Sequence, residues 1–182
     1  MRAWSQKSYF TSNHDENSWQ GTEFERMGAN HLPAFVLAAT LRGGMPLLYT
    51  GQEASNRKRL RFFEKDTVDW SGPSLAPFYR AMFDLKHRNE ALWNGAWGGA
   101  QTRLGPTSAS GLASGRTYAF ARTKGTNTVV VAVNFGDAPA RVAYAGLARP
   151  GAYRDWFSGS TATLGASGSI EVPANGYRIL VR

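Results

Sequence analysis

Three consecutive residues, Asn13, His14 and Asp15, are the part of this sequence best suited to chemistry. They follow a short run of strand-forming residues, 9–12, and Trp19 comes shortly after them. In parallel α/β barrels, active-site groups lie on the loops at the carboxyl ends of the strands. A histidine beside a carboxylate, with an aromatic ring nearby, suits a polar, hydroxylated ligand. Taken alone, the triplet could equally cap a helix or form an Asx turn.

The elements around this triplet follow a βαβα order. Residues 9–12 are predicted to form a strand, and residues 30–41 an almost wholly apolar helix. A short apolar run at 45–50, bounded by turn signals, is typical of a fully buried strand, which Pro46 can occupy only near its start. Residues 76–93 have the apolar spacing of a second helix. This order predicts a parallel α/β layer with right-handed crossovers.

The second half of the chain has a different composition. Residues 94–100 are rich in glycine, which is typical of a connector, and few acids follow them. The short β-branched runs beyond, separated by turn residues, are typical of strands. The predicted strands are 117–122, 128–134, 140–145, 153–157, 169–172 and 177–181. Short strands at this spacing indicate an antiparallel β-sandwich.

A second polar loop gives the triplet its context. The predicted strand at 45–50 ends in Gly51, Gln52 and Glu53. The two segments, with a helix between them, closely resemble the end of the catalytic barrel of the α-amylase superfamily (glycoside hydrolase family 13). In that family the seventh barrel strand carries an Asn-His-Asp motif, and the eighth ends in Gly-Gln-Glu or a close variant. Residues 62–70 are similar to the family's stretch between the eighth strand and the last helix.

The resemblance implies a fold class of α/β plus all-β. Residues 1–93 would be the C-terminal part of a (β/α)8 TIM barrel, comprising strands 7 and 8 with their helices. Residues 94–182 would be the family's β-sandwich C-terminal domain. The resemblance also implies an enzyme, a retaining α-glycosidase acting on α-1,4-glucan or maltooligosaccharide substrates.

The same resemblance implies a role for each residue of the triplet. Asp15 matches the carboxylate that hydrogen-bonds the sugar at the cleaved bond and stabilises its oxocarbenium-like transition state. His14 matches the histidine that grips the same sugar, and Asn13 is expected to orient the loop. Trp19 could stack on a sugar ring or serve ordinary packing. The Gly-Gln-Glu segment is expected to shape the rim of the site.

Two groups that the reaction needs are missing from the sequence. Retaining hydrolysis uses a nucleophilic carboxylate and an acid/base carboxylate about 5 Å apart. The family carries them after barrel strands four and five, upstream of the strand that opens this chain. We therefore expect a segment that is inactive alone, with the missing N-terminal barrel portion as its partner. Two βα units cannot close a barrel, so the barrel part is not expected to fold alone, whereas the sandwich could.

Composition limits the other classes of protein. The chain has 182 residues, 42% of them hydrophobic, and no cysteine, which excludes disulfides, thiolate metal sites and thiol catalysis. No apolar stretch approaches the roughly 20 residues that span a bilayer, so no membrane partner is expected. No cofactor or metal-ligand cluster is evident, and calcium is expected only in a complete enzyme. Residues 1–4 lead into no apolar signal region, and the resemblance leaves an extracellular or periplasmic location open.

The net charge of +8 and the pI of about 10.1 invite a nucleic-acid interpretation. The distribution of charge argues against it. Residues 1–93 carry 12 basic and 10 acidic side chains, whereas residues 94–182 carry 9 and 3, with the arginines spread singly. Nucleic-acid surfaces usually cluster their charges. The dense basic run at 57–61 is closely followed by acids, so we expect a solvated, partly self-neutralising loop and no nucleic-acid partner.

A second class of function stays open. The sandwich could be a non-catalytic carbohydrate-binding or accessory module that offers aromatic stacking faces, although core packing is the favoured role for those rings. The candidate aromatic residues are Trp93, Trp97, Tyr153 and Trp156.

Overall fold

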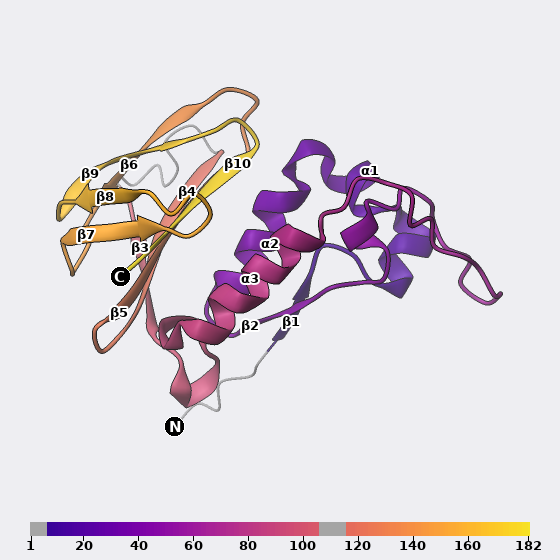
Figure 1. Cartoon of the computed structure of the whole chain (residues 1–182), viewed down its shortest axis with the longest axis horizontal. Helices are drawn as coiled ribbons and strands as arrows, with labels where there is room; N and C mark the ends of the chain where they lie inside the picture. Colours follow the sequence, from indigo (N-terminus) through magenta and orange to yellow (C-terminus); the bar gives the residue numbers. More distant parts are fainter. Residues whose placement is uncertain (1–6, 106–115) are drawn as a thin grey trace.

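The computed structural model describes residues 7–105 and 116–182 (Figure 1). Residues 1–4, for which no signal region is predicted, lie outside the described residues. A helical part with a small parallel sheet comes first along the chain, and an all-β part follows it. No helix of the described residues is long and apolar enough to cross a membrane.

The parallel β-α-β order predicted for the first half is confirmed. Strand β1 (Lys7–Phe10) pairs with strand β2 (Gly44–Leu47), with Lys7 opposite Gly44 and Phe10 opposite Leu47. Four helical segments lie between these strands: η1 (Glu16–Gln20), α1 (Glu23–Met27), η2 (Gly28–Asn30) and α2 (His31–Thr40). The apolar helix expected at 30–41 is α2.

The expectation of a fully buried strand at 45–50 is wrong for the described structure. The strand is shorter and begins earlier, and the side chains of Met45 and Leu47 are 50% and 37% exposed. The reason is that β2 is hydrogen-bonded to a single neighbour among the described residues. Pro46 lies inside the strand rather than at its first residue, which is tolerated because an edge strand can lack one N–H.

The segment after β2 is long and mostly irregular. It passes through η3 (Gln52–Ala54) and reaches α3 (Ala76–Arg88). This helix is shorter than the predicted 76–93, because Asn89 has extended backbone angles and a separate turn, η4 (Glu90–Leu92), follows. A last turn, η5 (Gly95–Trp97), lies in the predicted connector.

The all-β part is an antiparallel sandwich. A six-stranded sheet has the order β3-β4-β5-β10-β7-β8, and β6 pairs with β9 opposite it. The strands are β3 (Ala100–Leu104), β4 (Thr117–Lys124), β5 (Asn127–Asn134), β6 (Ala140–Ala145), β7 (Gly151–Asp155), β8 (Thr161–Leu164), β9 (Ser167–Val172) and β10 (Gly176–Val181). All six predicted strands are present, β7 shifted by two residues, while β3 and β8 were not predicted.

The large sheet is buried on both faces. Alternate residues of a strand point to opposite faces, and in β5 Val130 and Ala132 join the core between the two sheets. Val129, Val131 and Val133 join a second core, together with residues of α2 and α3. Helix α2 contacts β1 and β2 as well as β5 and β10, so it lies between the parallel pair and the sandwich (Figure 1).

Arg122 fastens the helices to the sandwich. Its side chain is fully buried on β4, and its guanidinium donates to the carbonyl oxygens of Thr40 at 2.8 Å, Trp93 at 3.2 Å and Gly99 at 3.2 Å. Thr40 is the last residue of α2, where the negative end of the helix dipole favours a cation. Burial lowers the pKa of Arg122 to about 10, which leaves it charged at neutral pH.

Candidate active site

The predicted triplet lies where β1 ends. Thr11 and Ser12 are buried beneath it. The side-chain oxygen of Asn13 accepts a hydrogen bond from the Glu16 backbone N–H at 2.8 Å, and the Asn13 carbonyl accepts from the Asn17 N–H at 2.8 Å. Asn13 therefore caps the helical turn that follows.

The side chains of His14 and Asp15 are largely exposed to solvent. Their side chains are 68% and 63% exposed, and His14 Nε2 lies 3.5 Å from Asp15 Oδ2. The nearby acid Glu16 is instead paired with Arg26, at 2.9 Å. A carboxylate and an imidazole that are exposed side by side can both hydrogen-bond the hydroxyl groups of a ligand.

The buried side chain of Gln52 links the segment after β1 to the segment after β2. Its side chain is 2% exposed, its Nε2 donates to Thr11 Oγ1 at 2.9 Å, and its Oε1 accepts from the Tyr49 N–H at 2.8 Å. This position differs from the predicted one, because Gln52 lies under the triplet rather than on the rim. Glu53 is partly buried, and its Oε2 has no hydrogen-bond partner among the described residues.

A buried acid lies next to this junction. Glu23 is 1% exposed, and one of its carboxylate oxygens has no hydrogen-bond partner in the described part of the chain. Burial raises the pKa of the Glu23 carboxyl, and the nearby Gln52 and Arg26 oppose this only in part. Sequence reasoning missed Glu23, because nothing in its local pattern distinguishes it from the exposed Glu25 beside it.

The predicted aromatic candidate Trp19 belongs to a larger group. Its ring is 57% exposed and lies 5.4 Å from the Phe62 ring and 6.3 Å from the Phe63 ring. Phe62 also lies 5.7 Å from the His14 ring. We call Trp19, Phe62 and Phe63 the aromatic cluster. Sequence reasoning missed both phenylalanines as site residues, although an aromatic doublet within a charged loop was a usable signal.

The loop that carries the doublet is docked on the triplet's helical turn. The Leu60 N–H donates to Asn17 Oδ1 at 2.7 Å, and Ser18 Oγ donates to the Leu60 carbonyl at 2.7 Å. Arg59 forms a two-pronged pair with Glu25, at 3.0 to 3.1 Å. This pair lowers the pKa of Glu25 to about 2. The loop is thus more than the solvated segment that was expected.

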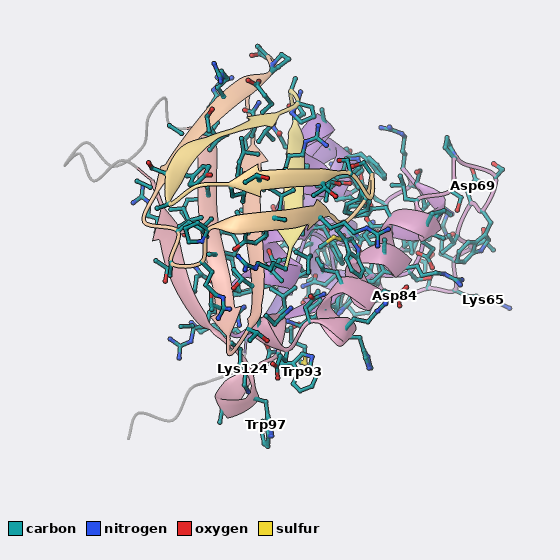
Figure 2. All side chains as sticks on the ribbon, turned by 60° about the vertical axis from the view of Figure 1, so that its left-hand side comes forward. Lys65, Asp69, Asp84, Trp93, Trp97 and Lys124 are labelled. Carbon is teal, nitrogen blue, oxygen red and sulfur yellow. The ribbon has the colours of Figure 1, made fainter. Side chains whose placement is uncertain are left out.

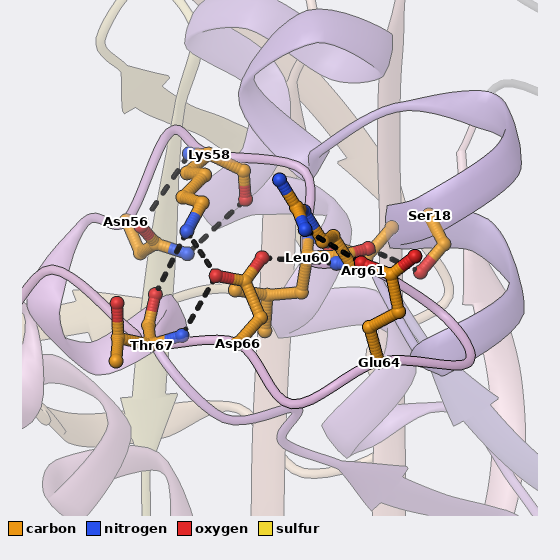
Figure 3. A network of polar contacts seen from close by, with 9 residues as sticks. Ser18, Asn56, Lys58, Leu60, Arg61, Glu64, Asp66 and Thr67 are labelled. Carbon is orange, nitrogen blue, oxygen red and sulfur yellow. Dashed lines mark hydrogen bonds and ion pairs between the residues drawn. The ribbon is translucent and has the colours of Figure 1, made fainter.

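The loop also neutralises part of its own charge, as predicted. Lys58 pairs with Asp66, and Arg61 pairs with Glu64 (Figure 3). The hydrogen bond from Lys58 lowers the pKa of Asp66 to about 2, helped by the Arg61 N–H. The acid at 66 is therefore engaged in holding the loop rather than placed beside Asp15.

The four aromatic residues considered for the accessory function lie in different settings. Tyr153 is buried in the core between the sheets, and Trp156 is partly buried with its indole N–H donated to the Ala81 carbonyl at 3.0 Å. Trp93 and Trp97 are 41% and 70% exposed at the connector, close to Lys124 (Figure 2). Only the last two offer open faces.

Among residues 7–105 and 116–182 there is no group of three or more His, Asp or Glu side chains that could hold a metal ion.

Comparisons with known proteins bear on both parts of the chain. The family model for the C-terminal all-beta domain of alpha amylase matches residues 113–181. No curated protein sequence matches the chain.

Solved structures match almost the whole chain. The noncanonic maltogenic alpha-amylase AmyB from Thermotoga neapolitana has a TM-score of 0.73 at 16% identity, covering 96% of this chain and 40% of that one. The cyclomaltodextrin glucanotransferase CldA has a TM-score of 0.71 at 19% identity, covering 99% and 37%. The alpha-amylase from Geobacillus thermoleovorans has a TM-score of 0.67 at 16% identity, covering 98% and 39%.

These similarities have two consequences. At such low identity they show the fold, and the chain spans about two fifths of the length of these structures. The match of residues 113–181 confirms the predicted family resemblance. Residues 113–181 therefore resemble the C-terminal all-beta domain of alpha amylase.

Proposed function

We propose that this chain is the C-terminal segment of a retaining α-glycosidase of the α-amylase type, acting on α-1,4-glucan or maltooligosaccharide bonds. One observation carries the proposal: His14 and Asp15 are exposed side by side at the carboxyl end of a parallel strand pair. That edge is where barrel enzymes place their active sites. Solved neighbours include an alpha-amylase complexed with acarbose and the protein AmyP in complex with maltose, which supports a glucan substrate.

In this proposal β1 and β2 are the seventh and eighth strands of a barrel whose remaining strands lie outside the chain. Phe10, Met45 and Leu47 are all more than a third exposed on these strands. Buried oxygens of Ser12 and Glu53 lack a hydrogen-bond partner in the described part of the chain. Uncovered apolar side chains and unpaired buried oxygens are both expected where neighbouring strands are absent.

Asp15 would stabilise the positive charge that develops on the sugar, and His14 would hold its hydroxyl groups. The nucleophile and the acid/base would come from the upstream strands, about 5 Å apart. The chain alone is therefore expected to leave maltoheptaose intact.

The test is an Asp15→Asn substitution in the chain fused behind the upstream barrel strands of its parent enzyme. Loss of one group that stabilises the transition state should lower kcat by about 100-fold to 1000-fold. Asp84→Asn, on the exposed side of α3 (Figure 2), is the matched control and should leave kcat unchanged. Near-normal turnover of maltoheptaose by the Asp15→Asn enzyme would refute the proposal.

A second candidate function is a carbohydrate-binding accessory module, which the open faces of Trp93 and Trp97 favour. Trp93 also lines a cavity of about 400 Å³ with Phe83, Lys86, His87 and Asn94. If this module binds glucan, Trp97→Ala should abolish saturable maltoheptaose binding by the chain, whereas the catalytic proposal predicts no such loss.

A further inference from the structure

The aromatic cluster forms the wall of a hollow beside the triplet. The hollow has a volume of about 330 Å³, within the range of roughly 300–1,000 Å³ typical of small-molecule sites. Its lining includes Ser18, Trp19, Arg61, Phe62, Phe63 and Glu64. Phe63 is 85% exposed. Its ring is therefore available to a ligand, and covering it would remove apolar surface from water.

The cluster is held in place by groups that are themselves fixed. Asn17 is 3% exposed, and its side chain and that of Ser18 bind both sides of the Leu60 peptide backbone. The phenylalanine doublet begins two residues later. The rings also contact one another, with Phe62 and Phe63 at 4.7 Å and nearly perpendicular. A wall that is ordered before the ligand arrives loses less entropy on binding.

The rim of the hollow is polar and exposed. Arg61 and Glu64 form an ion pair whose side chains are 68% and 64% exposed. Both can therefore hydrogen-bond to a ligand while it rests against the rings. A pyranose ring has the matching character, since its C–H face is apolar and its hydroxyl groups point outward along its edge.

We propose that the aromatic cluster is a binding subsite for a glucose unit of the α-glucan, beyond the unit held by His14 and Asp15. The inference rests on the proposed function and extends it. Continuity with the triplet supports it, because the Phe62 ring lies 5.7 Å from His14 and 5.4 Å from Trp19. A chain bound at the triplet can thus continue onto the cluster. Phe62 and Phe63 become residues that set chain-length preference.

The missing barrel strands are the other occupant to consider. They would pack on the sides of β1 and β2, where Phe10 and Met45 are exposed. The cluster belongs instead to the loops that follow these strands, and such loops border the mouth of a barrel. Covering it with protein would also bury the Arg61–Glu64 pair, and burying an ion pair is costly.

The first test uses the whole chain and maltoheptaose, followed by NMR at the indole N–H of Trp19 and of Trp97. Saturable shifts are expected at Trp19. Phe63→Ala should weaken the apparent affinity about fivefold to tenfold, in keeping with the loss of one stacking contact. Trp70→Ala, an exposed aromatic of the same segment (61%), is the matched control and should not change it. Absence of saturable shifts at Trp19, or wild-type affinity in Phe63→Ala, would overturn the subsite.

The second test separates failure of the subsite from failure of the proposed function. In the fused enzyme, Phe63→Ala should raise KM for maltoheptaose several-fold with little change in its kcat, because a contact remote from the cleaved bond binds the ground state and the transition state equally. If Asp15→Asn is inactive but Phe63→Ala behaves as wild type, the subsite alone is refuted. If Asp15→Asn is active, the proposed function is refuted whatever Phe63→Ala does.

Discussion

The ammonium group of Lys86 lies in the seam between α2, α3 and the connector. It donates to the carbonyl oxygens of Ala39 at 3.2 Å and Leu92 at 2.8 Å, and to the side-chain oxygen of Asn94 at 3.3 Å. No carboxylate is among these partners. Burial, helped by the positive charge of Arg122, lowers the pKa of Lys86 to about 8. Lys86 and Arg122 therefore lie in the same seam, and the hydrogen bonds described for them go to backbone carbonyl oxygens and the Asn94 side-chain oxygen.

This arrangement predicts a pH dependence of stability that belongs to Lys86. The unfolded chain would hold the lysine proton up to a pKa of about 10.4, whereas the folded protein releases it near pH 8. Between these values the unfolded state binds more protons, so the free energy of unfolding rises with pH. The slope is at most about 1.4 kcal/mol per pH unit.

Urea unfolding of the wild type and of Lys86→Met between pH 7 and pH 10 would measure this contribution. Other groups titrate alike in both proteins, so the difference between them isolates Lys86. Relative to Lys86→Met, the wild type should gain stability above pH 8. Lys65→Met, on an exposed loop (Figure 2), should keep the wild-type profile. Parallel profiles for wild type and Lys86→Met would contradict the prediction.

Some residues of the candidate site could be predicted from the sequence, and others could not. His14 and Asp15 were found because they are adjacent in a motif that follows a strand. Phe62 and Phe63 were not assigned to the site, because their place depends on the docking of the Leu60 backbone on Asn17, 43 positions earlier. Contacts of that kind are set by tertiary structure, and no local pattern records them.

At the scale of elements, the β1-α2-β2 unit depends on close packing at one glycine. A Cβ atom added to Gly44 would lie 2.6 Å from the Ala38 carbonyl oxygen, 2.8 Å from the Tyr9 ring and 3.0 Å from the Leu41 carbonyl oxygen. Two of these atoms are backbone and cannot rotate away. The start of β2 can therefore lie against the end of α2 only because residue 44 has no side chain.

Gly44→Ala is accordingly expected to push β2 away from α2 and lower the free energy of unfolding by about 1–3 kcal/mol. The measurement is the midpoint of urea unfolding of the whole chain. Gly105→Ala serves as the control, since the nearest atom to its added Cβ is Arg103 Nε at 3.9 Å. Equal midpoints for the two variants would show that the close packing at Gly44 is not needed.

The elements themselves were predictable to different degrees. The run of β-branched residues in β5 and the apolar run of α2 gave strong signals, and both elements are present. Strands β3 and β8 were missed because Ala100–Leu104 and Thr161–Leu164 contain few large apolar residues. These two segments form strands because β3 pairs with β4 and β8 pairs with β7, although their own compositions do not indicate strands.

At the scale of the molecule, the helical part and the sandwich share a core. Phe35, Val36 and Met82 from the helices are fully buried with Val131 and Ile179 of the large sheet. The sandwich was expected to be able to fold alone. Without the helices, the sheet face that includes Val131 and Ile179 would meet water. Exposing a valine or isoleucine costs about 1.5–3 kcal/mol each, and a domain's whole stability is about 5–15 kcal/mol.

Residues 94–182 produced alone are therefore expected to lack a cooperative urea transition and to bind a hydrophobic dye, whereas the whole chain should unfold cooperatively. The double substitution Val131→Thr and Ile179→Thr is the control, since it should have different effects in the fragment and in the whole chain. In the fragment, the double substitution should reduce dye binding, because it makes the uncovered face more polar. In the whole chain it should lower the free energy of unfolding, because the same side chains are buried against α2 and α3. A fragment that unfolds cooperatively at the midpoint of the whole chain would show that the sandwich does not need the helices.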